Sequence, residues 1–212
     1  MAVAPTSPAR AGVGEGLAAS RRGDFAMALR TLRPLAEEGV AEAEYLFGSQ
    51  YHFGRDIAQD DAEAAKWFRK AAEQADAEAC SDLGQLYSEG RGVPQDHGEA
   101  AKWWRLVAEQ GVPAAQANPG LAYSDGRGVV ADPVLADTWL ELARSGLPPG
   151  AVRDQVVEWQ SAVGASMEPA KIAEAKRLAL ESKPKAGQGA STPPHWRSYL
   201  SRVGHLLSPR GG

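Results

Sequence analysis

The sequence has a single cysteine, Cys80, so no disulfide bond can form within the chain. It also lacks a run approaching the roughly 18 apolar residues of a membrane-spanning helix. There are four histidines, and no two have the spacing of metal ligands on one helix. The hydrolase motif GxSxG, the zinc motif HExxH and the phosphate-binding motif GxxxxGK[ST] are all missing. We therefore expect no metal, no cofactor and no enzymatic activity.

The composition is that of an ordinary soluble globular protein, with 43% hydrophobic and 24% charged residues. The formal net charge of −4 gives no reason to expect nucleic-acid binding. The N-terminal stretch MAVAPTSPARAGVGEG lacks the positive start and apolar block of a signal peptide. We expect a cytoplasmic protein. The alternative is a periplasmic or secreted one, whose export signal is missing from the recorded start.

What the sequence does contain is a repeat with a period of 36 residues, covering segments 41–76, 77–112 and 113–148. Self-similarity of this length at a fixed period predicts an array of stacked structural units. The period preserves glycine, tyrosine, aspartate, alanine and tryptophan. The recurring residues are Gly48, Gly84 and Gly120; Tyr51, Tyr87 and Tyr123; Gly54, Gly90 and Gly126; Asp60, Asp96 and Asp132; Ala64, Ala100 and Ala136; and Trp67, Trp103 and Trp139.

Each repeat is predicted to form two helices. A small residue such as Gly84 within the first helix lets the second helix approach closely, which offsets its cost of about 1 kcal/mol relative to alanine. Gly90 suits the left-handed conformation that ends a helix. Asp60 suits the N-cap of the second helix, and Glu63 completes a predicted capping box. Pro119 interrupts the third repeat, where we expect a kink or a helix start.

The full pattern, AxAxxxLGxxYxxGxGVxxDxxxAxxWxxxxAExG, resembles the SEL-one-like repeat (SLR) family, a relative of the tetratricopeptide repeats. The resemblance covers about residues 20–148. It implies an all-α fold, an α-solenoid of antiparallel helix pairs in a right-handed superhelix. It also implies a bacterial adaptor that binds other proteins or peptides rather than an enzyme.

The sequence predicts three regions. Residues 1–12 are rich in Ala, Pro, Ser and Thr and are expected to be disordered. A helical repeat domain over 13–182 follows, with capping helices that cover the end of the stack. A basic linker and a short amphipathic tail helix occupy 183–212. Within the domain we expect a degenerate opening pair at 13–40, repeats at 41–76, 77–112 and 113–148, and capping helices at 149–182.

In related helix-pair solenoids the first helix of each pair lines the concave surface, and the resemblance places a binding groove there. Tyr45 and Phe53 add apolar area, and several acids make the groove acidic, so we expect an apolar partner peptide with basic residues. A plain solvated helix face is the alternative for any single residue. The candidate contacts are Glu42, Tyr45, Ser49, His52, Phe53, Glu78, Ser81, Gln85, Ser88, Glu89, Leu121 and Asp125.

The tail segment 195–207, HWRSYLSRVGHLL, has apolar residues on one helical face and Arg197 and Arg202 off that face. Such a helix can bind a partner groove or an anionic membrane surface. Disorder and docking onto the chain's own solenoid are the alternatives. A membrane-linked regulatory adaptor and a hydrolase are the rival functions to a monomeric binding scaffold. The tail contacts are Trp196, Tyr199, Leu200 and Val203.

Overall fold

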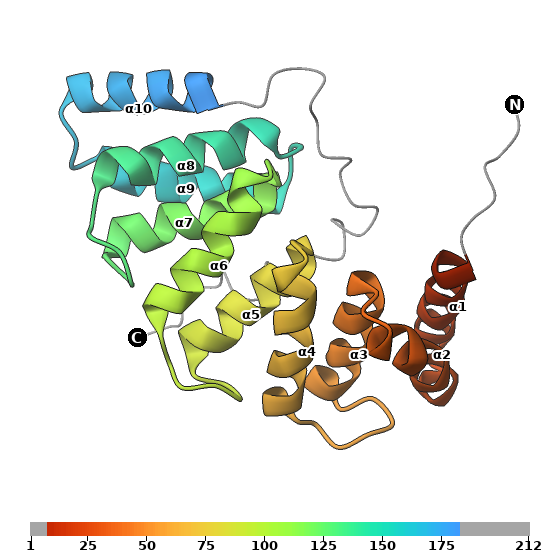
Figure 1. Cartoon of the computed structure of the whole chain (residues 1–212). Coiled ribbons are helices and arrows are strands. Elements are labelled where there is room, and N and C mark those ends of the chain that lie inside the picture. Colours follow the sequence, from red (N-terminus) through yellow and green to blue (C-terminus); the bar gives the residue numbers. More distant parts are fainter. Residues whose placement is uncertain (1–7, 183–212) are drawn as a thin grey trace, which may run out of the picture. The chain divides into compact units, whose positions relative to one another are not determined.

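The computed structural model of the chain describes residues 8–182, and every regular element in this range is an α-helix (Figure 1). This confirms the all-α prediction. The predicted tail contacts Trp196, Tyr199, Leu200 and Val203 lie outside the described residues. The helices are α1 (Pro8–Arg22), α2 (Phe25–Glu37), α3 (Ala41–Phe53), α4 (Asp61–Glu73), α5 (Ala77–Glu89), α6 (His97–Glu109), α7 (Pro113–Asp125), α8 (Pro133–Gly146), α9 (Ala151–Gly164) and α10 (Pro169–Ser182).

The helices fall into two compact units. The first unit, residues 1–96, contains α1 to α5, and the second unit, residues 97–212, contains α6 to α10. In the first unit each helix packs against the next along the chain. In the second unit α7 packs against α6 and α8, and α8 also packs against α9 and α10. Packing between neighbours in sequence is what an α-solenoid requires. The handedness of the superhelix stays a prediction.

Aspartate side chains cap the N-termini of α2 and α4, and the cap at Asp60 was predicted. The Asp24 carboxylate accepts from the N–H of Met27, and Asp60 accepts from the N–H groups of Ala62 and Glu63. These bonds satisfy amide donors that lack a partner within the helix. The predicted capping box at Asp60 is wrong, because its own N–H donates elsewhere and the Glu63 carboxylate pairs with Lys66 at 2.7 Å.

The N–H of the recurring aspartate donates to the carbonyl oxygen of the recurring tyrosine nine residues earlier. This bond closes the loop between the paired helices with backbone atoms alone, so it explains the fixed loop length and not the choice of tyrosine. The recurring glycine after the first helix has the left-handed conformation at Gly54, Gly90 and Gly126, as expected. The three bonded pairs are Asp60–Tyr51, Asp96–Tyr87 and Asp132–Tyr123, at 3.0, 2.9 and 3.0 Å.

A second glycine of the same loops packs against the preceding repeat. A β-carbon on Gly92 would lie 2.2 Å from the carbonyl carbon of Asp61, at the start of α4. A β-carbon on Gly128 would lie 2.1 Å from the carbonyl oxygen of His97, at the start of α6. Asp61 and His97 are themselves one period apart. The loop of one repeat therefore lies directly on the first residue of the previous repeat's second helix, at a distance that only glycine permits.

Small residues set the distance between the paired helices. A β-carbon on Gly48 would lie 3.0 Å from the Phe68 ring, and one on Gly120 would lie 2.8 Å from Leu140, so both glycines are in tight contact with the second helix as predicted. Phe68 and Leu140 are fully buried. Trp67 is only half-buried, with its ring edge-on to Phe47 and the Lys70 ammonium over its face. Alanine, leucine and phenylalanine therefore carry more of the core than the tryptophans do.

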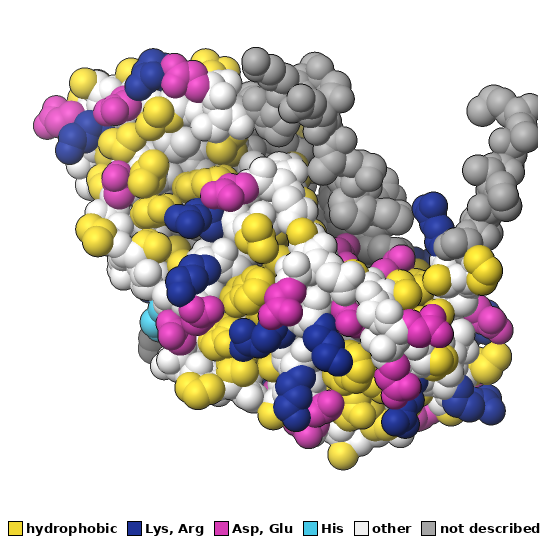
Figure 2. All heavy atoms as spheres, viewed as in Figure 1, with side chains coloured by type: hydrophobic (Ala, Val, Ile, Leu, Met, Phe, Trp, Pro, Cys, Tyr) yellow, Lys and Arg dark blue, Asp and Glu magenta, His cyan; other side chains and the backbone are white. Residues whose placement is uncertain are grey.

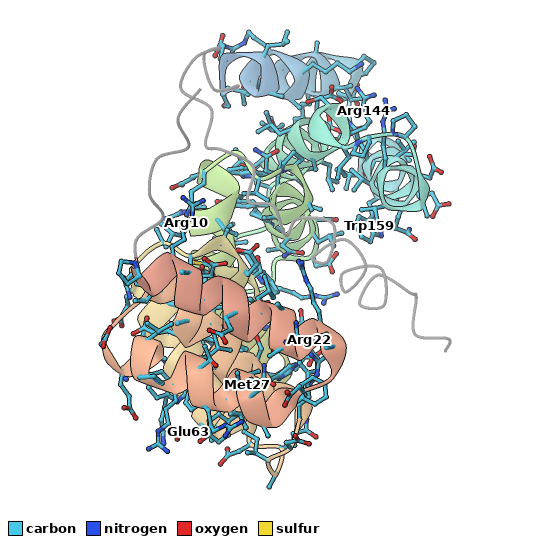
Figure 3. All side chains as sticks on the ribbon, turned by 90° about the vertical axis from the view of Figure 1, so that its right-hand side faces the viewer. Arg10, Arg22, Met27, Glu63, Arg144 and Trp159 are labelled. Atoms are coloured by element: carbon cyan, nitrogen blue, oxygen red, sulfur yellow. The ribbon has the colours of Figure 1, made fainter. Side chains whose placement is uncertain are left out.

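Helices α8 and α9 meet through polar side chains. Arg144 on α8 forms an ion pair with Glu141 at 2.6 Å, and Gln160 on α9 donates to the same carboxylate at 3.0 Å. Arg144 and Trp159 extend from these two helices in Figure 3. Burial raises the pKa of the Asp137 carboxyl, one turn before Glu141. Helices α8 and α9 are thus joined by a hydrogen-bonded network as well as by apolar packing.

Two boundaries differ from the prediction. Helix α1 begins at Pro8, so residues 8–12 are helical and the disorder expected for them is wrong. Proline suits the first turn of a helix, where its missing N–H costs nothing. Helix α7 runs from Pro113 to Asp125 without a break, so it does not start at Pro119. Pro119 is buried within it, and tertiary packing therefore outweighs its cost.

Candidate binding face of the first helices

Charge is segregated between the first and second helices of the repeats. The sequences of α3, α5 and α7 contain no lysine or arginine, whereas α3 carries Glu42 and Glu44 and α5 carries Glu78, Asp82 and Glu89. The second helices α4 and α6 carry both signs, and neighbouring side chains on each helix pair with one another. The negative charge of the first helices was predicted from single residues, and it holds for the whole of α3, α5 and α7.

The candidate contacts differ in exposure. Tyr45, Ser49 and Ser81 are buried, so Tyr45 does not supply the exposed apolar area that we expected of it. Its ring lies against Phe68, with 5.6 Å between ring centroids. Phe53 is 41% exposed. The other candidates in the first unit are half-buried: Glu42, His52, Glu78, Gln85, Ser88 and Glu89.

Two residues of this surface were missed by the sequence reasoning. Leu46 and Asp82 are half-buried and occupy the same register position, one period apart. Because Leu46 lies one helical turn after Glu42, and Asp82 one turn after Glu78, a four-residue step along each helix would have found both. We call the following set the acidic face of the first unit: Glu42, Leu46 and Phe53 on α3, and Glu78, Asp82, Gln85 and Glu89 on α5.

Four carboxylates gather at one end of this acidic face. Asp76 precedes α5, and its carboxylate accepts from the N–H of Ala79 at 2.9 Å. Burial, followed by the nearby charges of Glu78, Glu42 and Asp82, raises the pKa of Asp76 to about 7. The Tyr45 hydroxyl lies 3.3 Å from the Asp82 carboxylate and donates to it, which links α3 to α5. The acids of two successive repeats therefore act on one another, and negative potential concentrates here.

A network of paired side chains borders the other end of the acidic face. His52 Nδ1 lies 2.7 Å from one oxygen of Asp61, and the Arg91 guanidinium lies 2.9 Å from the other oxygen. Arg91 also reaches Glu89 at 3.5 Å, and Gln85 donates to Glu89 at 2.5 Å. His52 thus pairs with the first residue of α4 in its own repeat, and the partner contact expected of it stays a prediction. Arg91 offsets the charge of Glu89 and leaves the acidic character at the opposite end.

The two candidates in the second unit are placed differently. Leu121 is half-buried on α7, and Asp125 is exposed at the end of that helix and pairs with Arg127 at 2.5 Å. Figure 2 shows charged side chains of both signs interspersed with hydrophobic ones on the face it presents. The concentration of acids is therefore a feature of α3 and α5 rather than of the visible surface as a whole.

The remaining reactive groups have structural roles. Cys80 is buried, and burial raises the pKa of its thiol to about 12, so the nucleophilic thiolate is suppressed. Among residues 8–182, no group of three or more His, Cys, Asp or Glu side chains is arranged to hold a metal ion. None of the helices α1 to α10 has the length and apolar character needed to cross a membrane.

The repeats match a known family model. The Sel1 repeat model matches residues 41–76, 77–112 and 113–145, in the register of the recurring glycines and tyrosines. The chain belongs to the Sel1-repeat family. Sel1 repeats generally serve as scaffolds for protein–protein interaction. The curated proteins compared with this Sel1-repeat chain include no match.

Solved structures share the Sel1-repeat fold. A Sel1 repeat protein from Oxalobacter formigenes has a TM-score of 0.64 and 24% identity, covering 95% of this chain and 91% of that one. A protective antigen present in uropathogenic Escherichia coli strains, which displays an SLR fold, has a TM-score of 0.54 and 22% identity. That match covers 96% of this chain and 51% of the antigen. At these identities the likeness establishes the architecture alone.

Proposed function

We propose that this Sel1-repeat protein is a non-enzymatic binding scaffold whose acidic face binds a basic, partly apolar peptide or helix of another protein. The observation that carries the proposal is the charge segregation of the repeats, since α3 and α5 hold acids and no lysine or arginine. A partner with cations at helical spacing would supply the opposite charge. Complementary charge of this kind chiefly sets the encounter rate and the choice of partner.

Apolar contact would supply the rest of the affinity. Phe53 is 41% exposed at the end of α3, and Leu46 is half-buried on α3 at the register position that Asp82 occupies on α5. Side chains of a partner helix at positions i, i+3 or i+4 and i+7 meet such a surface along one face. The acidic face thus favours an amphipathic ligand over a purely basic one. The generally protein-binding character of Sel1 repeats supports the same reading.

The test uses two synthetic 14-residue amphipathic peptides with identical leucine positions, one with lysine and one with glutamate on the polar face. Binding of each labelled peptide to the full chain is measured by fluorescence anisotropy. We expect the lysine peptide to bind and the glutamate peptide to fail. Equal binding of the two would refute the charge argument, and failure of both would refute the proposed ligand class.

Variants locate the site. The double substitution Glu42→Gln and Glu78→Gln removes two half-buried acids of the acidic face. Exposed ion pairs are worth about 0.2–1 kcal/mol each, so the loss of two predicts roughly 2- to 30-fold weaker binding of the lysine peptide. The matched control is Glu38→Gln with Glu73→Gln, which makes the same charge change at exposed positions outside the acidic face. Equal weakening by both pairs would show a diffuse charge effect rather than a site.

A further inference from the structure

An arginine follows the left-handed glycine in every repeat loop, as Arg55, Arg91 and Arg127. The Arg91 guanidinium binds a carboxylate of the preceding repeat, because its Nη2 and Nε atoms lie 2.9 Å and 3.0 Å from one oxygen of Asp61. Asp61 is the first residue of α4, and the first residue of α2, one period earlier, is Phe25. Arg55 therefore occupies the position of a carboxylate-binding arginine, with an aromatic ring where Arg91 has an acid.

Two aromatic rings hold the Arg55 guanidinium. Its central carbon lies 5.1 Å from the centroid of the Phe25 ring and 4.8 Å from that of the Phe53 ring. Both are cation–π contacts, which hold a guanidinium in place without using its N–H donors. With residues 8–182 as possible partners, the Arg55 side chain forms no hydrogen bond and no ion pair. The rings thus preorganise a cation whose N–H groups have no acceptor in the described chain.

The charges that adjoin the site in the chain favour an anion. The Asp24 carboxylate is engaged by a backbone N–H as the cap of α2, and the Asp56 carboxylate forms no ion pair with Arg55. Arg21 and Arg22 form the exposed last turn of α1, directly before that cap, and within residues 8–182 neither pairs with an acid. Figure 3 shows Arg22 at this end of α1. An anion that approaches Arg55 therefore meets more cations than acids among these residues.

We propose that Phe25, Phe53 and Arg55 form a binding site for one aspartate or glutamate side chain of a partner protein. The carboxylate would bind Arg55 as Asp61 binds Arg91. An apolar side chain beside it would pack on Phe53, which is 41% exposed. The fixed fork of N–H donors distinguishes arginine from lysine in such a site. The inference goes beyond the proposed function and does not rest on it, since it concerns an acid of the partner rather than its cations.

A single carboxylate beside an apolar residue fits this site better than a polyanion does. The acids of α3 and α5, among them Glu42 and Glu78, repel a chain of phosphates or of glutamates. The net charge of −4 acts in the same direction. One partly exposed ion pair and one ring contact give weak binding, with a Kd on the order of 1 mM. The site would therefore add selectivity to a larger contact with a partner protein.

The test follows the binding of two blocked dipeptides to the full, isotope-labelled chain by NMR. N-acetyl-aspartyl-leucine amide carries the carboxylate and the apolar side chain, and N-acetyl-asparaginyl-leucine amide lacks only the charge. We expect the aspartyl peptide to shift the Arg55 Nε–Hε resonance and the backbone amide of Asp56, with a Kd on the order of 1 mM. We expect the asparaginyl peptide to bind about fivefold more weakly.

Variants at exposed arginines locate the site. Arg55→Gln is expected to weaken binding of the aspartyl peptide about fivefold, measured on the Asp56 amide. Arg55→Lys keeps the charge without the guanidinium, and we expect it to recover only part of this loss. Arg30→Gln is the matched control, because Arg30 is an exposed arginine of α2 outside the two ring contacts. This control is expected to keep the full affinity.

Several outcomes would overturn the inference. Equal binding of the two dipeptides would show that no carboxylate is recognised, and equal weakening by Arg55→Gln and Arg30→Gln would show a diffuse charge effect. Full affinity in Arg55→Lys would reduce the site to a point charge. Inorganic phosphate that binds more tightly than the aspartyl peptide would assign Arg55 to a phosphate ligand such as a nucleic acid. The lysine-peptide test does not involve Arg55, so it decides the proposed function separately.

Discussion

Replacing Gly92 by alanine tests whether the loops fasten neighbouring repeats together. Gly92 has a φ of +67°, and its β-carbon would lie 2.2 Å from the carbonyl carbon of Asp61 and 2.3 Å from the carbonyl oxygen. The obstructing atoms are backbone, at the start of a helix fixed by the Asp60 cap, so they cannot rotate away. The loop must move off α4 instead.

Two costs add at this position. The left-handed conformation costs a non-glycine residue about 1–2 kcal/mol. Forcing extra volume into a packed contact costs about 1–3 kcal/mol more. We therefore expect Gly92→Ala to lower the free energy of unfolding by about 2–5 kcal/mol. Gly39→Ala is the matched control, because Gly39 has a φ of +85° with nothing within 4 Å of the added carbon, so only the conformational cost applies.

Urea unfolding followed by far-UV circular dichroism measures both variants. Gly39 and Gly92 belong to the same unit, so their effects are compared in one cooperative structure. The expected result is a Gly92→Ala loss that exceeds the Gly39→Ala loss by about 1–3 kcal/mol, with similar urea dependence. A Gly92→Ala loss no larger than that of Gly39→Ala would refute the contact between the loop and α4.

Three further predictions concern the acids, the core and the thiol. The folded pKa of Asp76, about 7, lies above the value of 3.8 for an unburied aspartate, so the wild-type chain loses stability as pH rises from about 4 to 7. Asp76→Asn keeps an N-cap residue and removes the titration, so urea unfolding at pH 8 should show a gain, up to about 4 kcal/mol at 1.36 kcal/mol per pKa unit; an unchanged pH profile would contradict this. Phe68 is fully buried, and Phe68→Ala should cost about 3–5 kcal/mol in the same assay; a loss below 1 kcal/mol would place the ring outside the core. Cys80 should react with a thiol reagent such as DTNB only at the rate of unfolding, whereas rapid reaction of the folded chain would contradict its burial.

The helix boundaries were predictable where the signal is local. Asp60 caps α4 and Gly54 ends α3 because cap geometry depends on a few adjacent residues. The composition of residues 8–12 suggested disorder, but Val13 and Ala19 are buried, and packing of α1 against α2 stabilises the helix from Pro8 onward. Contacts with a neighbouring helix are absent from a local composition count, and this is why the boundary was misplaced.

The candidate site was predicted less well than the fold, for a reason that depends on packing. The sequence places Tyr45 beside the core stripe of α3, and its burial depends on Phe68 in the following helix and on Asp82 in the following repeat. Asp82 was missed for the same reason, since its exposure is set by how α5 lies on its neighbours. The sign of the charge needed no such information, because α3 and α5 contain no lysine or arginine.

The two kinds of helix handle charge in different ways, and this difference bears on function. On the second helices an acid and a cation lie three or four residues apart, as in Lys66–Glu63 and Arg105–Glu109, so each helix offsets its own charge. The first helices α3, α5 and α7 contain no lysine or arginine, so the opposing charge comes from other parts of the chain, as Arg91 supplies it to Glu89 and Lys70 on α4 supplies it to Glu44. Solubility alone does not require α3, α5 and α7 to lack lysine and arginine. A solenoid that selects a basic partner gains both attraction and discrimination from it.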